Sequence, residues 1–474
     1  MSRRRMRYIV AMSAVLATVA AKASPRIGLS FTGITNDDIV ALGQDLAPPD
    51  TTGTAGPNHF AAFLNGGFAA YDKSTGALVG QKISDTQFWT NAGIFPGLGN
   101  LSDPRLIYDP TSSHWFAAQI TLESTRNRVL LARSDSPDPT AGWKAVSFKV
   151  SGGFADFPML GVDADGVYVS ANVFDSRTGQ SLTGASVFSI PKADLLSSTP
   201  SIARMTPFEN LDLIQRGFTI QPVNDFGPSK GHGSLIAVDA IQLGKIDRTN
   251  IIGPAFANAA LSPTTVIAAA DESLPPLGRQ PDGTQRLDFG NDNYLASVYQ
   301  VGDSIWAVHG TDVNNHAAIR WTVLDEKTHA IIQEGTIADG RYDFLYPSIA
   351  GNQFGEAVIG YTRTGSGPTD FPGAFASIWT TADGVTTFGD PVLLQAGLAN
   401  YHKFNSPLSP ERWGDYSQTS IDPDNPHIFW TTQEFSMTVD RWGTQITQII
   451  VPEPATAGLV LLASTLLLCW RRRA

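Results

Sequence analysis

The sequence predicts an all-β protein made of repeated units. Short runs rich in Val, Ile, Phe, Tyr and Trp dominate, and 44 glycines and 30 prolines interrupt them, as expected for many short strands joined by turns. Few stretches keep the 3.6-residue apolar period of a helix. The chain has 474 residues, of which 42% are hydrophobic and 10% aromatic, so it is long and apolar enough to bury a large core.

Single hairpins can be read directly from the sequence. Asp165 and Gly166 form a two-residue turn signal between two β-prone runs in the segment 162–174. The segments 105–120, 297–311 and 420–435 have the same strand–turn–strand pattern. These hairpins recur along the chain rather than clustering in one part of it.

The hairpins belong to a longer repeat, which usually begins at an aspartate. The repeat starts lie at Asp50, Asp103, Asp156, Gln221, Asp292, Asp343 and Asp415. Successive starts are 51 to 72 residues apart, and a repeat of this length with about four strands is typical of a β-propeller. We predict a single propeller of seven blades, with six as the alternative because the unit near Gln221 is the least regular.

The last unit predicts how the ring closes. The unit from Asp103 contains four strands, at 105–110, 114–120, 128–134 and 143–150, whereas the unit from Asp415 contains only three. The N-terminal run 26–31 can supply the fourth. We therefore expect an N-terminal strand to close the last blade, which would remove the open edge of the ring.

The first 23 residues have the form of a secretory signal peptide. A basic start precedes an apolar run from Tyr8 to Ala21, and Ala21 and Ala23 make a small-x-small cleavage site. The 14-residue apolar run is short for a membrane span, so an uncleaved anchor is the lesser alternative. We predict a signal peptide at 1–23 and a body at 24–451, with short hydrophobic helices at both chain ends.

Charge and cysteine content exclude several functions. The formal net charge is −11, and eight of the 33 basic residues lie in the two terminal segments, so the body is strongly acidic. It should repel phosphate backbones, and no nucleic acid partner is expected. Cys469, in the tail, is the only cysteine, so the body has no disulfide, no cysteine-based zinc site and no thiol nucleophile.

The sequence predicts neither a metal site nor a cofactor. The eight histidines are scattered without the spacing of metal ligands. The Asp-rich turns at 163–166 and 422–426 resemble pieces of calcium loops, but they lack the full ligand spacing. Calcium is therefore only an alternative. Nucleotide-binding and α/β-hydrolase motifs are absent as well.

One turn resembles a structural motif of sialidase-like propellers. Ser136, Asp138 and Trp143 match the Asp box, S-x-D-x-G-x-x-W, with Thr140 in the glycine position. A second copy at the same place in its unit contains Thr381, Asp383 and Phe388. In that family the box is a folding element, so the resemblance implies the sialidase-like fold and not a catalytic site.

The body as a whole resembles a group of bacterial exported sialidase-like propellers. The matching stretches include 48–60, 102–116, 156–172 and 412–435, and together they span most of the chain from Asp50 to Phe435. The resemblance implies a fold without a defined reaction.

The C-terminal segment 452–474 resembles the PEP-CTERM sorting signal of Gram-negative bacteria. The signal residues are Pro452, Glu453, Pro454, Arg471, Arg472 and Arg473, and the apolar run 455–470 lies between them. The resemblance implies recognition by an exosortase, a transient transmembrane helix at 455–470 in the inner membrane, and removal of the tail. The product would be released or held at the cell surface, among proteins associated with exopolysaccharide and biofilm. A permanent anchor is the alternative.

The sequence leaves two functions open. True sialidases grip a carboxylate with three arginines and use a Tyr/Glu nucleophile pair and an acidic aspartate. The catalytic candidates here are Arg105, Arg320, Arg341, Arg412 and Asp415. For Arg412 and Asp415, three residues apart, the structural alternative is a local Arg–Asp contact. Aspartates repeated at the same place in most units are more typical of a scaffold. We therefore expect a surface or matrix propeller that binds extracellular polysaccharide or a surface protein without catalysis. A sialidase-like glycoside hydrolase or lyase is the alternative.

Overall fold

The computed structural model describes residues 24–94, 100–123, 127–175, 181–239, 242–270, 273–284, 286–289, 297–382, 385–404 and 409–452. The predicted signal peptide with Ala21 and Ala23, and the predicted tail helix with Glu453, Pro454 and the three terminal arginines, lie outside these ranges. Within these ranges no helix has both the length and the apolar character that a membrane span requires.

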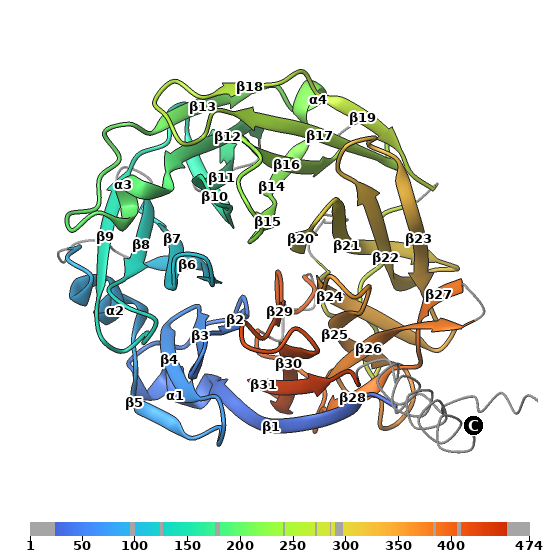
Figure 1. Ribbon diagram of the computed structural model, residues 1–474. Coiled ribbons are helices and arrows are strands. Elements are labelled where there is room, and N and C mark those ends of the chain that lie inside the picture. Colours follow the sequence, from blue (N-terminus) through green and yellow to red (C-terminus); the bar gives the residue numbers. More distant parts are fainter. Residues whose placement is uncertain are drawn as a thin grey trace, which may run out of the picture. The chain divides into compact units, whose positions relative to one another are not determined.

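Residues Arg26–Ile450 form one compact unit that contains seven sheets of four or five strands each. The sheets stand around a central axis like the blades of a propeller (Figure 1). The prediction of seven blades is confirmed, and the alternative of six is excluded. The unit near Gln221, the least regular in sequence, forms a complete blade.

The first three blades follow the chain from the inside outward. Blade 1 contains β2 (Thr52–Ala55), β3 (His59–Leu64), β4 (Gly67–Asp72) and β5 (Leu78–Ile83). Blade 2 contains β6 (Leu101–Asp109), β7 (His114–Thr121), β8 (Val129–Ser134) and β9 (Trp143–Phe148). Blade 3 contains β10 (Phe154–Val162), β11 (Gly166–Phe174), β12 (Leu182–Pro191) and β13 (Thr206–Leu211).

The next three blades carry additional short strands. Blade 4 contains β14 (Phe218–Pro222), β16 (His232–Val238), β17 (Lys245–Ile252), β18 (Ala260–Leu261) and β19 (Thr265–Ala268). Blade 5 contains β15 (Asn224–Asp225), β20 (Ser297–Val301), β21 (Ser304–Val313), β22 (His316–Asp325) and β23 (Ile331–Ile337). Blade 6 contains β24 (Tyr342–Gly351), β25 (Ala357–Gly365), β26 (Gly373–Ala382), β27 (Val385–Phe388) and β28 (Val392–Gln395).

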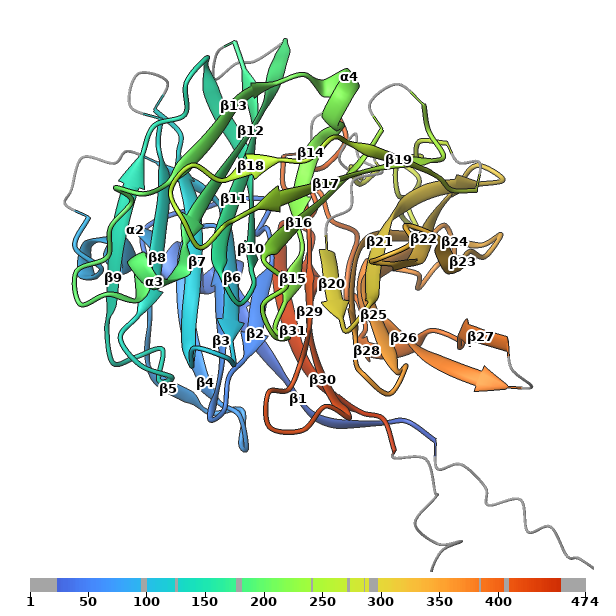
Figure 2. The ribbon, with the colours of Figure 1, turned by 45° about the horizontal axis from the view of Figure 1, so that its top comes forward.

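Blade 7 joins the two ends of the body, as the sequence predicts. It contains β29 (Gln418–Ile421), β30 (Ile428–Thr438), β31 (Arg441–Ile450) and, outermost, β1 (Arg26–Thr35). The ladder between β1 and β31 is antiparallel and begins with Arg26 opposite Ile450, and β1 lies beside β31 in both views of the ring (Figures 1 and 2). Pairing the outer strand in this way closes the ring.

In the described ranges, four short helices lie in the connections between strands. They are α1 (Asn36–Ala41), α2 (Asp85–Asn91), α3 (Lys192–Leu196) and α4 (Leu213–Arg216). Thr35 caps α1 reciprocally with Asp38, and Ser84 caps α2 through the amide of Gln87. These caps satisfy amides at the helix starts.

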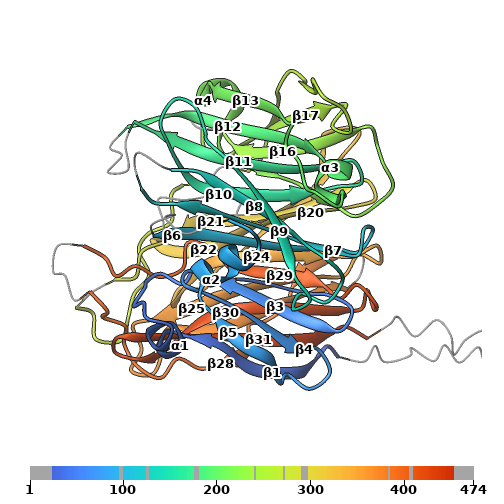
Figure 3. The same cartoon turned by 90° about the vertical axis from the view of Figure 1, so that its left-hand side faces the viewer.

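Aromatic side chains fill the spaces between neighbouring blades, whose strands lie side by side in the edge-on view (Figure 3). Phe60 of blade 1 lies 5.6 Å from Trp430 of blade 7 between ring centres. Trp306 of blade 5 lies 5.0 Å from Trp379 of blade 6. Rings at these separations bury large apolar areas, which allows a cysteine-free body to be held by its core.

The segment that resembles the first Asp box forms a hydrogen-bonded turn. Asp138 accepts a 2.8 Å hydrogen bond from the amide of Thr140, and Ser136 accepts one of 3.2 Å from the amide of Asp138. The Trp143 ring is buried 5.0 Å from Phe88. The box therefore shapes the turn between β8 and β9 and anchors it to the core.

Only Phe388 of the second Asp box can be described fully. It packs 5.0 Å from Trp379 and 5.4 Å from Trp321, as an Asp-box aromatic should. Asp383 lies outside the described residues, and the side chain of Thr381 is not described.

Candidate functional site

The innermost strands run parallel to one another around a central channel. The Tyr416 hydroxyl donates to the carbonyl of Pro104, and Gln418 donates to the carbonyl of Leu106. The chain therefore runs in the same direction at β29 and at β6. The channel therefore has two different mouths, one where the inner strands begin and one where they end.

Four aspartates gather at the mouth where the inner strands begin, which we call the carboxyl mouth. They are Asp50, Asp103, Asp156 and Asp415, and three of them, Asp50, Asp103 and Asp415, have positive φ angles of 49°, 60° and 133°. In blades 3, 4 and 6 the corresponding positive-φ residues are Phe157, Thr219 and Tyr346. A non-glycine residue in this conformation is uncommon, and here it accompanies a shift of register within β6, β10, β14 and β24.

The aspartates act partly as a scaffold. Asp103 accepts a 3.0 Å hydrogen bond from the amide of Phe157 in the next blade, and its own amide donates to Asn65 at 2.9 Å. Asn65 also donates 2.7 Å to Asp50 Oδ2. This chain of contacts ties blades 1, 2 and 3 together, in agreement with the scaffold role expected for repeated aspartates.

Two of the four candidate arginines lie at this mouth. Arg412 bridges two carboxylates, Asp415 at 2.6 Å and Asp288 at 3.2 Å. The guanidinium carbon of Arg105 lies 3.3 Å from the centre of the Tyr416 ring, and its Nε donates 2.8 Å to the carbonyl of Pro158. The predicted local contact between Arg412 and Asp415 is thus present.

The other two candidate arginines lie elsewhere. Arg320 lies on β22, the third strand of blade 5 counted from β20, and donates to Thr336 at 3.0 Å. Arg341 is 74% exposed, pairs with Asp339 at 3.4 Å and lies over the Tyr342 ring. The four arginines therefore do not form a three-arginine grip on a carboxylate.

Burial raises the pKa of several carboxyl groups at this mouth. It raises the pKa of Asp156 to about 7, with repulsion from Asp103 and Asp415 as the second cause. It also raises the pKa of Asp415 to about 7, against the opposing charge of Arg412. The pKa of Asp50 lies well above its usual value for the same reason, with Asp415 as its strongest negative neighbour. Protonated carboxyl groups near neutral pH can act as general acids.

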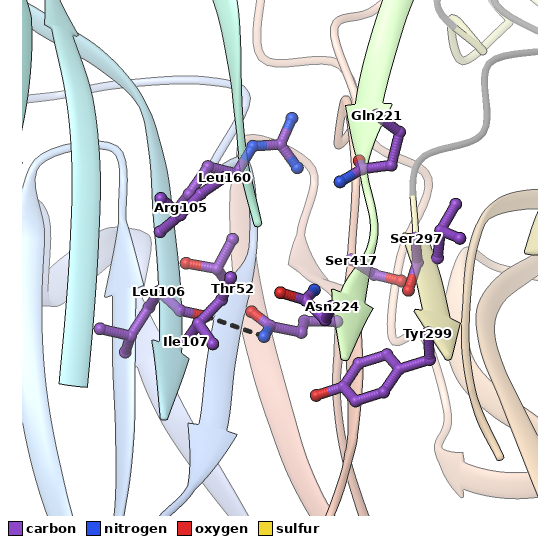
Figure 4. A pocket seen from close by; sticks show the side chains of 12 residues that line it. Thr52, Arg105, Leu106, Ile107, Leu160, Gln221, Asn224, Ser297, Tyr299 and Ser417 are labelled. Carbon is purple, nitrogen blue, oxygen red and sulfur yellow. Dashed lines mark hydrogen bonds between the residues drawn. The ribbon is translucent and has the colours of Figure 1, made fainter. Parts of the chain in front are cut away.

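A narrow cavity of about 40 Å³ forms the waist of the channel. Arg105 and Gln221 lie at one end of it and Tyr299 at the other (Figure 4). The Nη2 of Arg105 is buried without a hydrogen-bond partner among the described residues. A cavity of this size and polarity has room for water but not for a sugar ring.

Beyond the waist, a cavity of about 340 Å³ opens at the mouth where the inner strands end. We call it the aromatic pocket because Tyr108, Phe226 and Tyr299 line it. The ring centres of Phe226 and Tyr299 are 5.8 Å apart, and the ring planes meet edge to face at 72°. Its volume is within the usual range of small-ligand sites, and Tyr299 also lines the waist.

The charged groups in the aromatic pocket are already paired. Lys230 donates 2.7 Å to Asp225, and Lys73 donates 3.1 Å to Asp422. The second oxygen of Asp422 accepts a 2.9 Å hydrogen bond from Trp430. The pocket therefore offers apolar rings and neutral hydrogen-bonding groups such as Gln300, with no unpaired charge on these two carboxylates.

The aromatic pocket was not predicted from the sequence. Its aromatic residues come from blades 2 and 5 and from the segment after β15, far apart along the chain. The available signal was that each lies at or just after the end of an inner strand, where side chains from successive blades meet. Without the blade register, Phe226 and Tyr299 could not be distinguished from core residues.

No cluster of three or more His, Cys, Asp or Glu side chains in the described ranges has the geometry of a metal site. Asp163, in one of the calcium-like turns, accepts bonds from the amides of Asp165 and Gly166 and from the Tyr168 hydroxyl. In the other turn, Asp422 is held by Lys73 and Trp430. Both segments work as turns, as their residue types favour.

The fold and the channel define a class: a seven-bladed β-propeller with one carboxyl-rich and one aromatic mouth. No protein-family model matches the chain, and no curated protein sequence matches it.

Many solved structures are similar in arrangement. An alpha-L-arabinanase of Penicillium chrysogenum is 11% identical with a TM-score of 0.40, covering 88% of this chain and 98% of its own. The Hadza microbial sialidase Hz136 is 12% identical with a TM-score of 0.38, covering 84% and 65%. A protein of unknown function from Dyadobacter fermentans is 10% identical with a TM-score of 0.41, covering 74% and 94%. At these scores the matches carry no argument about activity.

Proposed function

We propose that the body is an exported propeller that binds a non-acidic extracellular polysaccharide in the aromatic pocket without catalysis. The single observation that carries this proposal is a 340 Å³ cavity lined by Tyr108, Phe226 and Tyr299. Sugar rings present apolar C–H faces and hydroxyl edges. Aromatic rings beside neutral amides can take up both at once.

Charge favours a non-acidic ligand. Asp225 and Asp422 are each matched by one lysine, and the chain as a whole carries a net charge of −11. An acidic polymer would be repelled by this surface. A neutral polymer would not need any of these ion pairs to break.

The destination of the protein is part of the same proposal. The signal-peptide pattern at 1–23 and the PEP-CTERM resemblance at 452–474 support export across the inner membrane of a Gram-negative bacterium. An exosortase would then remove the tail, and the body would remain at the cell surface or in the extracellular matrix. A propeller that binds polysaccharide is suited to that place.

A second candidate function is glycoside hydrolysis at the carboxyl mouth. It is supported by Asp156 and Asp415, whose raised pKa of about 7 suits a general acid. The positions of Arg320 and Arg341, away from this mouth, do not favour a sialidase in particular. A lyase would have to use the same carboxyl groups.

Binding and hydrolysis can be separated in one screen. The purified body, residues 24–451, is passed over neutral and acidic polysaccharides, with retention and released reducing ends both measured. We expect retention on a neutral polymer that falls at least tenfold in Phe226→Leu. It should be unchanged in Phe256→Leu, whose ring is 68% exposed and outside the pocket. Reducing-end release that is abolished in Asp415→Asn would contradict the non-catalytic proposal.

A further inference from the structure

A second cavity of about 360 Å³ lies beside the aromatic pocket, at the junction of blades 7 and 1. We call it the junction groove. Its walls include Asn58, Lys73, Asp424, Asn425 and Gln448. It shares one wall residue, Asp422, with the aromatic pocket.

Two tight turns place the groove and the pocket next to each other. Ala55, the last residue of β2, lines the pocket, and Asn58, in the turn from β2 to β3, lines the groove. In the turn between β29 and β30, Pro423 and Pro426 line the pocket, and Asn425, which lies between them, lines the groove. Because the same two turns form a wall of each cavity, a ligand longer than the pocket meets the groove next.

Lys73 holds the groove in shape across the blade junction. Its ammonium group lies 3.1 Å from Asp422 and 2.9 Å from Asp424, both in blade 7, while its own backbone belongs to blade 1. Its side chain is only 14% exposed. The amide of Lys73 also donates 2.9 Å to the carbonyl of Asn58, so the two blade 1 turns that line the groove are tied to each other.

The groove carries more negative than positive charge. Asp72, Asp422 and Asp424 face it with Lys73 as the one cation among its described wall residues. Hydrogen bonds from Ser74 and Thr75 lower the pKa of Asp72 to about 2, so this carboxylate stays ionised. An acidic polymer is therefore repelled, whereas the amides of Asn58, Asn425 and Gln448 can bond to hydroxyl groups.

From this geometry we infer that the ligand is a linear, non-acidic glycan that occupies the aromatic pocket and continues over Asp422 into the junction groove. This inference rests on the proposed function and adds the length, the course and the charge class of the ligand. The combined cavity, about 340 Å³ and 360 Å³, exceeds what a disaccharide fills. Affinity should therefore increase with chain length.

The test compares short and long oligosaccharides on the body, residues 24–451. Cello-, laminari- and malto-oligosaccharides, each as disaccharide and hexasaccharide, are titrated by calorimetry, with oligogalacturonates as the acidic arm. We expect the hexasaccharide of the preferred series to bind about tenfold more tightly than its disaccharide, a gain of about 1.4 kcal/mol.

Two variants separate the groove from the pocket. Asn58→Arg places a long side chain in the groove at an exposed position and should abolish the tenfold gain without weakening disaccharide binding. Its matched control is Asn91→Arg, at the exposed end of α2, which should retain the gain. Phe226→Leu should weaken both lengths.

Each outcome has a distinct meaning. Equal affinity for both lengths, or an unchanged gain in Asn58→Arg, would overturn the groove inference while the pocket remains supported. Preference for oligogalacturonate would overturn the inference that the ligand is non-acidic. If none of the neutral oligosaccharides binds, or Phe226→Leu has no effect on any of them, the proposed function itself fails.

Discussion

The carboxyl mouth should make folding stability fall as the pH rises through neutrality. The pKa of Asp156 rises from 3.8 to about 7 in the folded protein. Between about pH 4 and pH 7 the folded state therefore keeps a proton that the unfolded chain has released. Stability falls with pH wherever the folded state binds more protons. The stabilisation from this retained proton is fully present below pH 3.8, the pKa in the unfolded chain. It is lost as the pH rises to about 7, the pKa in the folded protein.

The size of the effect follows from the shift. A change from 3.8 to about 7 corresponds to at most about 4 kcal/mol, at about 1.4 kcal/mol per pKa unit. Asp156 is only partly buried and is coupled to Asp103 and Asp415, so we expect about half of that, roughly 2 kcal/mol.

Asp156→Asn tests this prediction, because an amide does not titrate. Urea unfolding of the body is measured at pH 5 and pH 8. Only the part of the loss between pH 5 and the folded pKa of about 7 falls in this window. The free energy of unfolding of the variant relative to the wild type should therefore rise by about 1.3 kcal/mol from pH 5 to pH 8. Asp72→Asn is the matched control. Its carboxyl, with a pKa of about 2, is ionised at both, so its difference from the wild type should not change. Parallel pH profiles for the wild type and Asp156→Asn would contradict the raised pKa of Asp156 in the folded protein.

Three further changes probe the ring and its charges. Deleting Arg26–Thr35 should abolish cooperative unfolding in circular dichroism, because β31 loses its outer partner; a normal transition would contradict closure by this strand. Trp430→Phe removes the 2.9 Å bond to Asp422 and should cost about 2 kcal/mol in urea unfolding; no loss would show that the bond is replaced. Arg412→Met leaves Asp415 without its cation. It should cost about 1–2 kcal/mol at pH 8, discounted because Arg412 is 44% exposed, and less at pH 5, where Asp415 is protonated; equal losses would argue against the pairing.

Most of the fold was readable from the sequence because each blade repeats the same local signals. The Asp165–Gly166 turn and the strands of the unit from Asp103 are visible in a window of a few residues. The closure by residues 26–31 also followed, since a three-strand last unit needs a partner for its outer strand. These features depend on short-range patterns and on the count of strands.

The candidate sites were only partly predictable because they depend on blade register. Arg412 and Asp415 are near neighbours in sequence, and their contact was predicted from that spacing. Asp288 comes from a distant segment that reaches Arg412 across the mouth, and nothing in its local sequence indicates this. Phe226 and Tyr299 meet only because β15 pairs with β20, a contact between strands separated by about 70 residues.

The most direct test of glycan binding is a crystal structure of the body with a bound neutral hexasaccharide. We expect sugar rings stacked on Phe226 and Tyr299, with the sugar chain continuing past Asp422 toward Asn58. Sugar density at the carboxyl mouth, between Asp156 and Asp415, with the aromatic pocket empty would contradict it and would favour the hydrolase.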